Sequence, residues 1–182
     1  MRPSLLHFLK STRATALIEL ALALPVLLTF LAGTVEVGFY LMLNQKLQHT
    51  AVALSDLTTR DEEISEGVLT DIFNAAPQIM NPFGMGDRSR VYISATGLSD
   101  AGDETVFWQR DGAGSLAQAS GVGTEGGSPT LPGDLPMREN ETIVVTEVFY
   151  RYEPIFFTMI GDTVLRRTAF FRPRIGALRE VE

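Results

Sequence analysis

The sequence predicts an α+β fold, in which a long N-terminal transmembrane helix and a second helix precede an antiparallel sheet of about four strands. Three observations support this prediction. Residues Leu20–Val35 form an unbroken run of sixteen uncharged, mostly aliphatic side chains. Apolar residues then recur every four positions toward residue 58, which is the spacing of one helical face. Farther along the chain, apolar and polar residues alternate in short segments, which is the pattern of half-buried strands.

The composition argues against an enzyme and for a membrane-attached structural or binding protein. The 182 residues carry 15 Lys and Arg against 22 Asp and Glu, a net charge of -7, so a positively charged nucleic-acid-binding surface is not expected. The chain has no cysteine and only two histidines, His7 and His49, which nearly excludes thiol chemistry and histidine-based metal sites. No phosphate-binding or serine-hydrolase motif occurs. We therefore expect no cofactor, no metal and no small-molecule substrate.

A membrane span is predicted near the N-terminus. The stretch Leu17–Val35 supplies nineteen residues with one charge, close to the roughly 20 residues that cross a bilayer. It is longer than the apolar region of a cleaved signal peptide, which has roughly 7–15 residues. Three basic residues, Arg2, Lys10 and Arg13, precede the span, and two lie in the following flank Asn44–Arg60. Because positive charge is retained on the cytoplasmic side, we expect a single-pass protein with a cytoplasmic N-terminus.

The predicted helix continues beyond the bilayer as an amphipathic helix. Its apolar positions step by four along the chain, and they are Leu43, Leu47, Ala51, Leu54 and Thr58. A stem helix over residues 15–58 would be roughly 65 Å long, because each residue adds 1.5 Å. We expect its outer half to pack on a soluble head.

Five residues within this stem are candidate functional positions. Glu19 places a carboxylate in the first turns of the span, where it either snorkels to the cytoplasmic interface or needs a partner. Pro25 favours a kink or local melting of the helix, and Gly33 and Gly38 loosen it further. Glu36 is predicted to mark the outer membrane edge, because the residues between the two glutamates span about 24 Å.

Two stretches of this segment resemble a known family. The run Ala14–Pro25 and the following Gly-Thr-Val-Glu-Val-Gly of Gly33–Gly38 look like the N-terminus of TadE-like (TadE/TadF-type) minor pilins, which are pseudopilins of tight-adherence (Flp/Tad) type IV pilus systems. That family has a short basic leader, a small residue, a glutamate at the fifth mature position, a proline six residues later and a Gly-x-x-Glu-x-Gly near the end of the span. The C-terminal segments Val144–Pro154 and Phe171–Arg174 resemble the family weakly.

The resemblance implies a processing site and a role for the first glutamate. A prepilin peptidase would cut between Ala14 and Thr15, so that residues 1–14 form a basic prepilin-type leader. The cut would free a charged amine on Thr15, and Glu19 of a neighbouring subunit would neutralise it in a low-dielectric helix bundle, where Coulomb attraction is far stronger than in water. The resemblance also implies an inner-membrane location, and it makes other pilins and pilus-assembly proteins the expected partners.

Residues 59–182 are predicted to form a periplasmic or extracellular α+β head. Thr59 and Glu62 have the spacing of a capping box at the start of the second helix, and Pro77 is expected to end that helix. Trp108 is expected in the core or half-buried in the sheet. The predicted strands cover residues 91–96, 105–110, 141–152 and 162–171, and the first two are expected to form a hairpin.

Three segments of the head are less regular. Residues 112–136 are rich in Gly, Ser and Pro and are predicted to be a flexible loop. An apolar patch is expected over residues 156–160. Four arginines near the last strand either bind acidic surfaces or protect an edge strand, and the second reading is the commoner one; they are Arg166, Arg167, Arg172 and Arg174.

Two functions from different classes fit these features. The first is a minor pilin of a tight-adherence pilus that takes part in pilus assembly and surface attachment. The second is a single-pass periplasmic binding or scaffold domain that is never processed or polymerised. The junction between Ala14 and Thr15 discriminates them, because a pilin is cut there and a fixed anchor is not.

Overall fold

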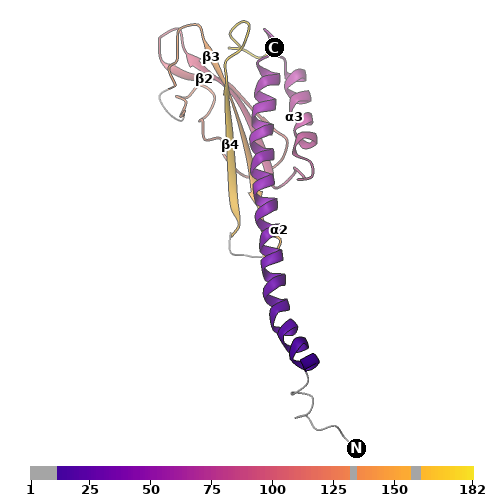
Figure 1. The fold of residues 1–182 in the computed structure, drawn as a ribbon. Helices are drawn as coiled ribbons and strands as arrows, with labels where there is room; N and C mark the ends of the chain where they lie inside the picture. The colour runs from indigo at the N-terminus through magenta and orange to yellow at the C-terminus, as the bar shows by residue number, and fades with distance from the viewer. Residues whose placement is uncertain (1–11, 132–134, 157–160) are drawn as a thin grey trace, which may run out of the picture.

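The computed structural model describes residues 12–131, 135–156 and 161–182, and it has the α+β architecture that the sequence predicts. A long helix, a shorter helix and four strands follow one another along the chain (Figure 1). The elements are α2 (Thr12–Thr58), α3 (Glu66–Met80), β1 (Ser89–Leu98), β2 (Glu104–Gly112), β3 (Thr142–Tyr152) and β4 (Thr163–Phe171). Most of the predicted leader, residues 1–11, and most of the predicted apolar patch, residues 157–160, lie outside the described residues.

The two halves of the long helix α2 differ in burial: residues 15–35, called the bare half below, have no buried side chain, whereas residues 36–58 pack on the head. Its N-terminal half extends away from the head (Figure 1) and exposes large apolar side chains, among them Leu17, Leu22 and Phe30. In its C-terminal half the predicted apolar face is buried, with Leu43, Leu47, Ala51, Leu54 and Thr58 all at 0–1% exposure. The switch follows the sequence, because residues 17–35 are apolar on all sides whereas the later residues are apolar on one face.

The four strands form one antiparallel sheet in the order β2-β1-β3-β4. β1 and β2 form the hairpin that the sequence predicts, and a register shift between Ala95 and Thr96 interrupts their ladder. β3 is central and rich in β-branched and aromatic residues, which fit a pleated and buried surface. Strands β2 and β4 are the two edges of the sheet.

Both helices cover the same face of the sheet and form the main core with it. The buried face of α2 packs against β3 and β4, and α3 lies beside α2 (Figure 1). Trp108 on β2 belongs to this core, as expected, and its indole Nε1 donates a hydrogen bond to the Leu178 carbonyl at 2.9 Å. The core side chains from the sheet include Val91, Ile93, Ala95, Val144, Val148, Leu165 and Ala169.

The opposite face of the sheet is covered by the connection between β2 and β3. The Gly- and Ser-rich composition predicted flexibility there, but Leu116 and Val122 are buried. The backbone of Val106 on β2 exchanges two hydrogen bonds with this connection, to the Gly127 carbonyl at 2.9 Å and from the Gly126 amide at 2.8 Å. A few apolar anchors and backbone pairing therefore hold a segment of low hydrophobicity on the sheet.

Two predictions about the second helix were wrong. Thr59 is not its N-cap, because its hydroxyl donates to the Ser55 carbonyl at 2.9 Å and so completes the last turn of α2. The N-cap is Ser65, whose side chain accepts a hydrogen bond from the Val68 amide. Pro77 does not end the helix, which continues to Met80. The added turn places the Met80 side chain in the core, and this burial outweighs the backbone hydrogen bond that a proline removes.

Candidate functional site on the stem helix

The predicted cleavage site lies in the first turn of α2. Thr12, Ala14 and Thr15 all have helical backbone, and the Thr15 side chain is exposed. The bond between Ala14 and Thr15 therefore joins two helical residues at the start of the described part of α2.

Glu19 is exposed on the bare half of α2, one turn after Thr15. Within the ranges that the structure describes, its carboxylate forms no hydrogen bond or ion pair. The surrounding exposed side chains, which include Leu17, Ile18 and Leu20, are apolar. A carboxylate in such surroundings is costly in hydrocarbon unless it meets a partner from outside this chain or reaches water.

Pro25 and the two glycines leave α2 continuous. The helix runs through Pro25 without interruption, and the Pro25 carbonyl accepts a hydrogen bond from the Thr29 hydroxyl at 2.8 Å. Of the two predicted effects of this proline, local melting is not seen in the described helix, and the kink stays a prediction. A Cβ added at Gly38 would meet no heavy atom within 4 Å, so packing within this chain does not require glycine there. Gly33 is half-buried.

Glu36 contrasts with Glu19, because it is buried and held by several donors. Its side chain is 2% exposed, and its carboxylate accepts a hydrogen bond from the Tyr152 hydroxyl at the end of β3. The Ile155 amide donates to Oε2 at 2.9 Å, and the Phe156 amide donates to the same oxygen at 2.7 Å. Charge-assisted bonds of this kind are roughly twice as strong as neutral ones. Glu36 therefore fixes the turn after β3 to the stem helix.

The contact also changes the acidity of the tyrosine. Burial, and then the hydrogen bond and the negative charge of Glu36, raise the pKa of Tyr152 to about 12. The Tyr152 ring packs edge-to-face on Tyr40, with ring centroids 5.1 Å apart. Tyr152 is therefore a neutral hydrogen-bond donor throughout the physiological pH range.

Glu147 is a structural carboxylate that the sequence analysis did not single out. It is fully buried on the face of β3 that is turned away from the helices, where Arg166 Nη2 lies 2.6 Å from its Oε1. The Gly121 amide donates to Oε1 at 3.0 Å, and the Ser120 hydroxyl donates to Oε2. The sequence contains a signal for the burial of Glu147, because Val145 and Phe149 stand two residues before and after it, and such positions share one face of a strand.

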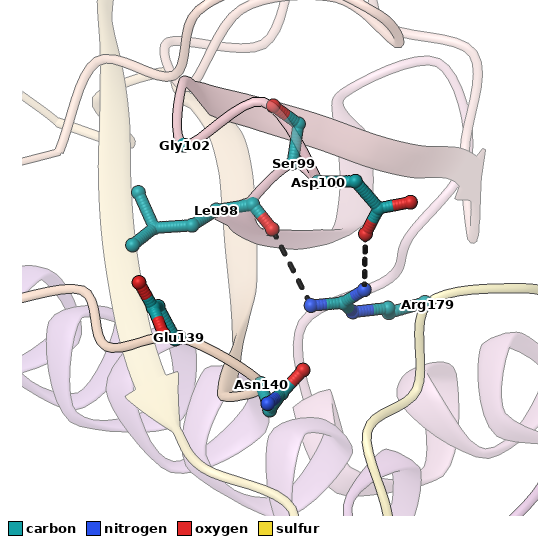
Figure 2. A pocket seen from close by; sticks show the side chains of 7 residues that line it. All are labelled: Leu98, Ser99, Asp100, Gly102, Glu139, Asn140 and Arg179. Carbon is teal, nitrogen blue, oxygen red and sulfur yellow. Dashed lines mark hydrogen bonds and ion pairs between the residues drawn. The ribbon is translucent and has the colours of Figure 1, made fainter.

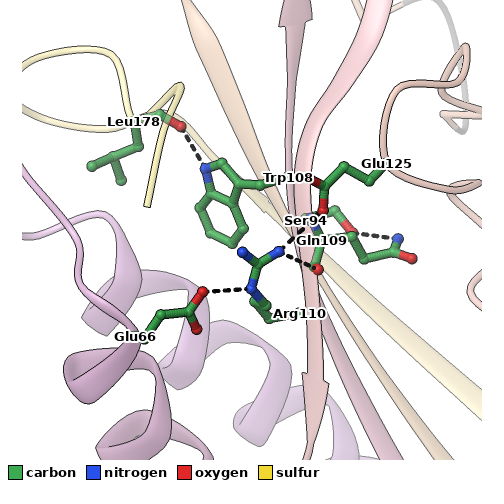
Figure 3. Close-up of polar contacts among 7 residues, drawn as sticks. All are labelled: Glu66, Ser94, Trp108, Gln109, Arg110, Glu125 and Leu178. Carbon is green, nitrogen blue, oxygen red and sulfur yellow. Dashed lines mark hydrogen bonds and ion pairs between the residues drawn. The ribbon is translucent and has the colours of Figure 1, made fainter. Parts of the chain in front are cut away.

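Other charged side chains also join segments within the chain. Arg110 on β2 bridges Glu66 of α3 at 2.8 Å and Glu125 of the β2–β3 connection at 3.0 Å (Figure 3). The hydrogen bond to Glu66 is the main cause of a raised pKa for Arg110. In Figure 3 the Gln109 amide reaches Ser94 on the neighbouring strand, at 2.8 Å.

The arginine cluster near β4 is largely engaged within the chain. Each of the four side chains contacts a polar group of another segment, and the pairs are Arg166 with Glu147, Arg167 with Asn44, Arg172 with Glu141 and Arg174 with Asp56. The Asn44 and Asp56 pairs tie the sheet and the segment after it to α2. Arginines that are paired within the chain favour the protection of an edge strand over the binding of acidic surfaces.

A polar pocket of about 270 Å³ lies between the β1–β2 turn, the residues before β3 and the C-terminal segment (Figure 2). The guanidinium of Arg179 lines this pocket. Its Nη1 donates to Asp100 Oδ1 at 3.2 Å, and its Nη2 donates to the Leu98 carbonyl at 3.4 Å. The guanidinium also lies 5.3 Å from the centroid of the Phe107 ring. These contacts hold the C-terminal segment on the β1–β2 hairpin. Among the described residues, no group of three or more His, Asp or Glu side chains is placed to bind a metal.

Comparison with known proteins supports the resemblance that the stem sequence shows. Residues 14–53 match the family model of TadE-like proteins. No curated protein and no solved structure matches the chain. The matched segment begins at the residue before the predicted cut and includes Glu19, Glu36 and most of α2. The resemblance to TadE-like pilins of tight-adherence pili is thus confirmed, and it lies in the long helix α2, which is long and apolar enough to cross a membrane.

Proposed function

We propose that this protein is a minor pilin, or pseudopilin, of a tight-adherence pilus that takes part in pilus assembly and surface attachment. The observation that carries the proposal is the match to TadE-like proteins over residues 14–53, which starts at the predicted cleavage site. A prepilin peptidase cuts between Ala14 and Thr15 in this proposal. The role is structural, in agreement with the family.

The bare half of α2 supports a role in assembly, because its exposed apolar side chains must be kept from water both before and after the subunit joins a pilus. Before assembly, lipid covers its apolar side chains, and after assembly the same surface packs on the helices of other subunits. Leu22 and Phe30 are 72% and 73% exposed, and each such side chain gains about 1.5–3 kcal/mol when it is fully buried away from water. The head leaves this surface uncovered.

Glu19 is the subunit-docking residue in this proposal. Cleavage creates a charged amine on Thr15, four residues from Glu19, so the two groups are separated by about 6 Å along the helix axis. The geometry of a single helix leaves Glu19 available to the Thr15 amine of a neighbouring helix that is shifted along the axis. In a bundle from which water is excluded, any other axial shift between the two helices would leave the Glu19 carboxylate and the Thr15 amine without a partner, and the cost of these buried charges disfavours that shift.

The orientation follows from the charge distribution around the span. We place the N-terminus in the cytoplasm and the head in the periplasm, in the inner membrane, because the segment before the span has more Lys and Arg than the segment after it. Assembly would then carry the head outward into the extracellular part of the pilus.

Substitution of Glu19 tests the docking step. Glu19→Ala and Glu19→Gln protein should reach the membrane in normal amounts but be recovered with sheared pili or the assembly complex at a strongly reduced level. Glu63→Ala is the matched control, because Glu63 is an exposed carboxylate of the head and its loss should leave recovery unchanged. Normal recovery of both Glu19 variants would show that Glu19 is only an interfacial carboxylate. A permanently anchored scaffold domain, which does not polymerise, would instead be missing from the sheared pili even as the wild type.

A further inference from the structure

The turn that follows β3 exposes two large apolar side chains at a specific height along the stem. Ile155 and Phe156 are 57% and 56% exposed, although their backbone amides are fixed to the buried carboxylate of Glu36. The turn is thus held firmly while its side chains face outward. Exposed apolar side chains on a fixed backbone are typical of a contact surface.

The position of Glu36 relates this turn to the membrane span. The predicted span ends at Val35, and from Thr15 onward, where the side chains of α2 are described, Glu36 is the first that is buried. A hydrogen bond of 2.7 Å joins the Phe156 amide to Glu36, so Phe156 lies at the same height along α2 as the end of the span. Figure 1 shows the start of β4 and the end of β3 beside α2, at the end of the head nearest the bare half of the helix.

A packed aromatic cluster holds the head against the stem close to Glu36. Phe39 contacts Phe83 at 6.5 Å between ring centroids, and Phe83 contacts Tyr150 at 6.4 Å. Arg88 and Glu153, an ion pair at 2.7 Å, line the same junction with charge that suits the headgroup region.

We propose that Ile155 and Phe156 form a second membrane contact, in which these two residues rest in the lipid interface on the head side of the bilayer and Glu36 sets their depth. Val35 and Val37, the exposed neighbours of Glu36 in α2, lie at the height at which the Ile155 and Phe156 amides bind Glu36, so lipid that surrounds the end of the span also reaches these two residues. The head is then held at two points, which limits its tilt about the helix. The inference rests on the membrane span of the proposed function.

Depth-dependent fluorescence quenching tests this contact in the full chain. Because the chain has no cysteine, Phe156→Cys, Leu27→Cys and Ala101→Cys each carry one environment-sensitive fluorophore. The proteins are reconstituted in phosphatidylethanolamine–phosphatidylglycerol vesicles that contain a lipid with a nitroxide just below the headgroup. Leu27 lies in the span and Ala101 in the exposed turn between β1 and β2, at the far end of the head.

The expected result is severalfold stronger quenching at position 156 than at position 101, together with a blue-shifted emission. Equal quenching at positions 156 and 101, with strong quenching at position 27, would overturn the inference while leaving the span intact. Absence of quenching at position 27 would instead remove the membrane span itself, and with it the proposed function.

Glu36→Gln tests the second half of the inference. The glutamine keeps the size of the side chain but replaces one acceptor oxygen with an NH₂ group, which cannot accept from the amides that Glu36 binds. In this variant, quenching at position 156 should fall toward the level at position 101. Unchanged quenching at position 156 would overturn the role of Glu36 in setting the depth. The label at position 101, with unchanged emission in both backgrounds, verifies that the head remains folded.

Discussion

The hydroxyl of Tyr152, at the end of β3, donates a hydrogen bond to the carboxylate of Glu36 on α2. This contact joins the last residue of β3 to the position on α2 at which the exposed half of the helix ends and the packed half begins. The contact therefore ties the sheet to the stem helix at this level. In a pilin-like assembly, this contact couples the membrane-embedded half of α2 to the head.

Removal of the hydroxyl should weaken the head. Tyr152→Phe leaves the ring in place but deprives a buried carboxylate of one donor, and hydrogen bonds to charged groups contribute about 1.5–3 kcal/mol to stability. Denaturant unfolding in detergent, followed by the fluorescence of the single tryptophan, measures the loss. Tyr40→Phe is the control, because the Tyr40 hydroxyl bonds to no other residue in the described part of the chain. An equal effect of both substitutions would contradict this role for Tyr152.

The Tyr152 contact also predicts a loss of stability at alkaline pH. The folded protein raises the pKa of Tyr152 from 10.0 to about 12. The stabilisation is therefore complete below pH 10 and declines as the pH rises from 10 toward 12, because the unfolded chain releases the proton first. The difference in unfolding free energy between the wild type and Tyr152→Phe should shrink across this interval. A constant difference up to pH 12 is the result that the account does not allow.

The buried pair of Glu147 and Arg166 should respond asymmetrically to substitution. Glu147 is fully buried, whereas the Arg166 side chain is 40% exposed. Arg166→Met leaves a buried carboxylate without its cation and should cost about 3 kcal/mol or more. Glu147→Gln leaves an arginine that reaches water, so it should cost less. Thermal unfolding of the two variants gives the comparison, and the reverse order would mean that the network around Ser120 stabilises Glu147 without Arg166.

The packed half of α2 should behave as an ordinary protein core. Leu47→Ala removes a fully buried side chain from the contact with the sheet and should cost about 2–5 kcal/mol, because a cavity remains. Val52→Ala, at a position that is 37% exposed on the same helix, should cost far less. Similar losses for both in chemical unfolding would show that the two faces of the helix are not differently buried.

The sequence allowed the fold class, the buried face of α2 and the strands to be predicted because each depends on a local periodicity. Leu43 and Leu47 are spaced for one helical face, and Val91 and Ile93 are spaced for one side of a strand. The start of α3 was misplaced because Thr59 and Glu62 match a capping box, but the chain uses Thr59 to complete the preceding helix.

The long-range polar contacts could not be predicted in the same way. Glu36 stood out in the sequence as a membrane boundary, but its donors come from residues 152–156, and only the tertiary fold brings them to α2. Glu147 was missed because a glutamate within an apolar strand can be either exposed or paired, and its partner Arg166 lies on another strand. The family resemblance supplied the roles of Ala14, Thr15 and Glu19, which stay predictions.

Processing at the N-terminus is the most direct test of the pilin assignment. The measurement is the intact mass and N-terminal sequence of the protein from cells with and without the prepilin peptidase. We predict a mature chain that begins at Thr15 when the peptidase is present and a chain that retains the leader when it is absent. A chain that begins at Met1 in both strains would contradict the assignment and would identify the protein as a fixed membrane anchor.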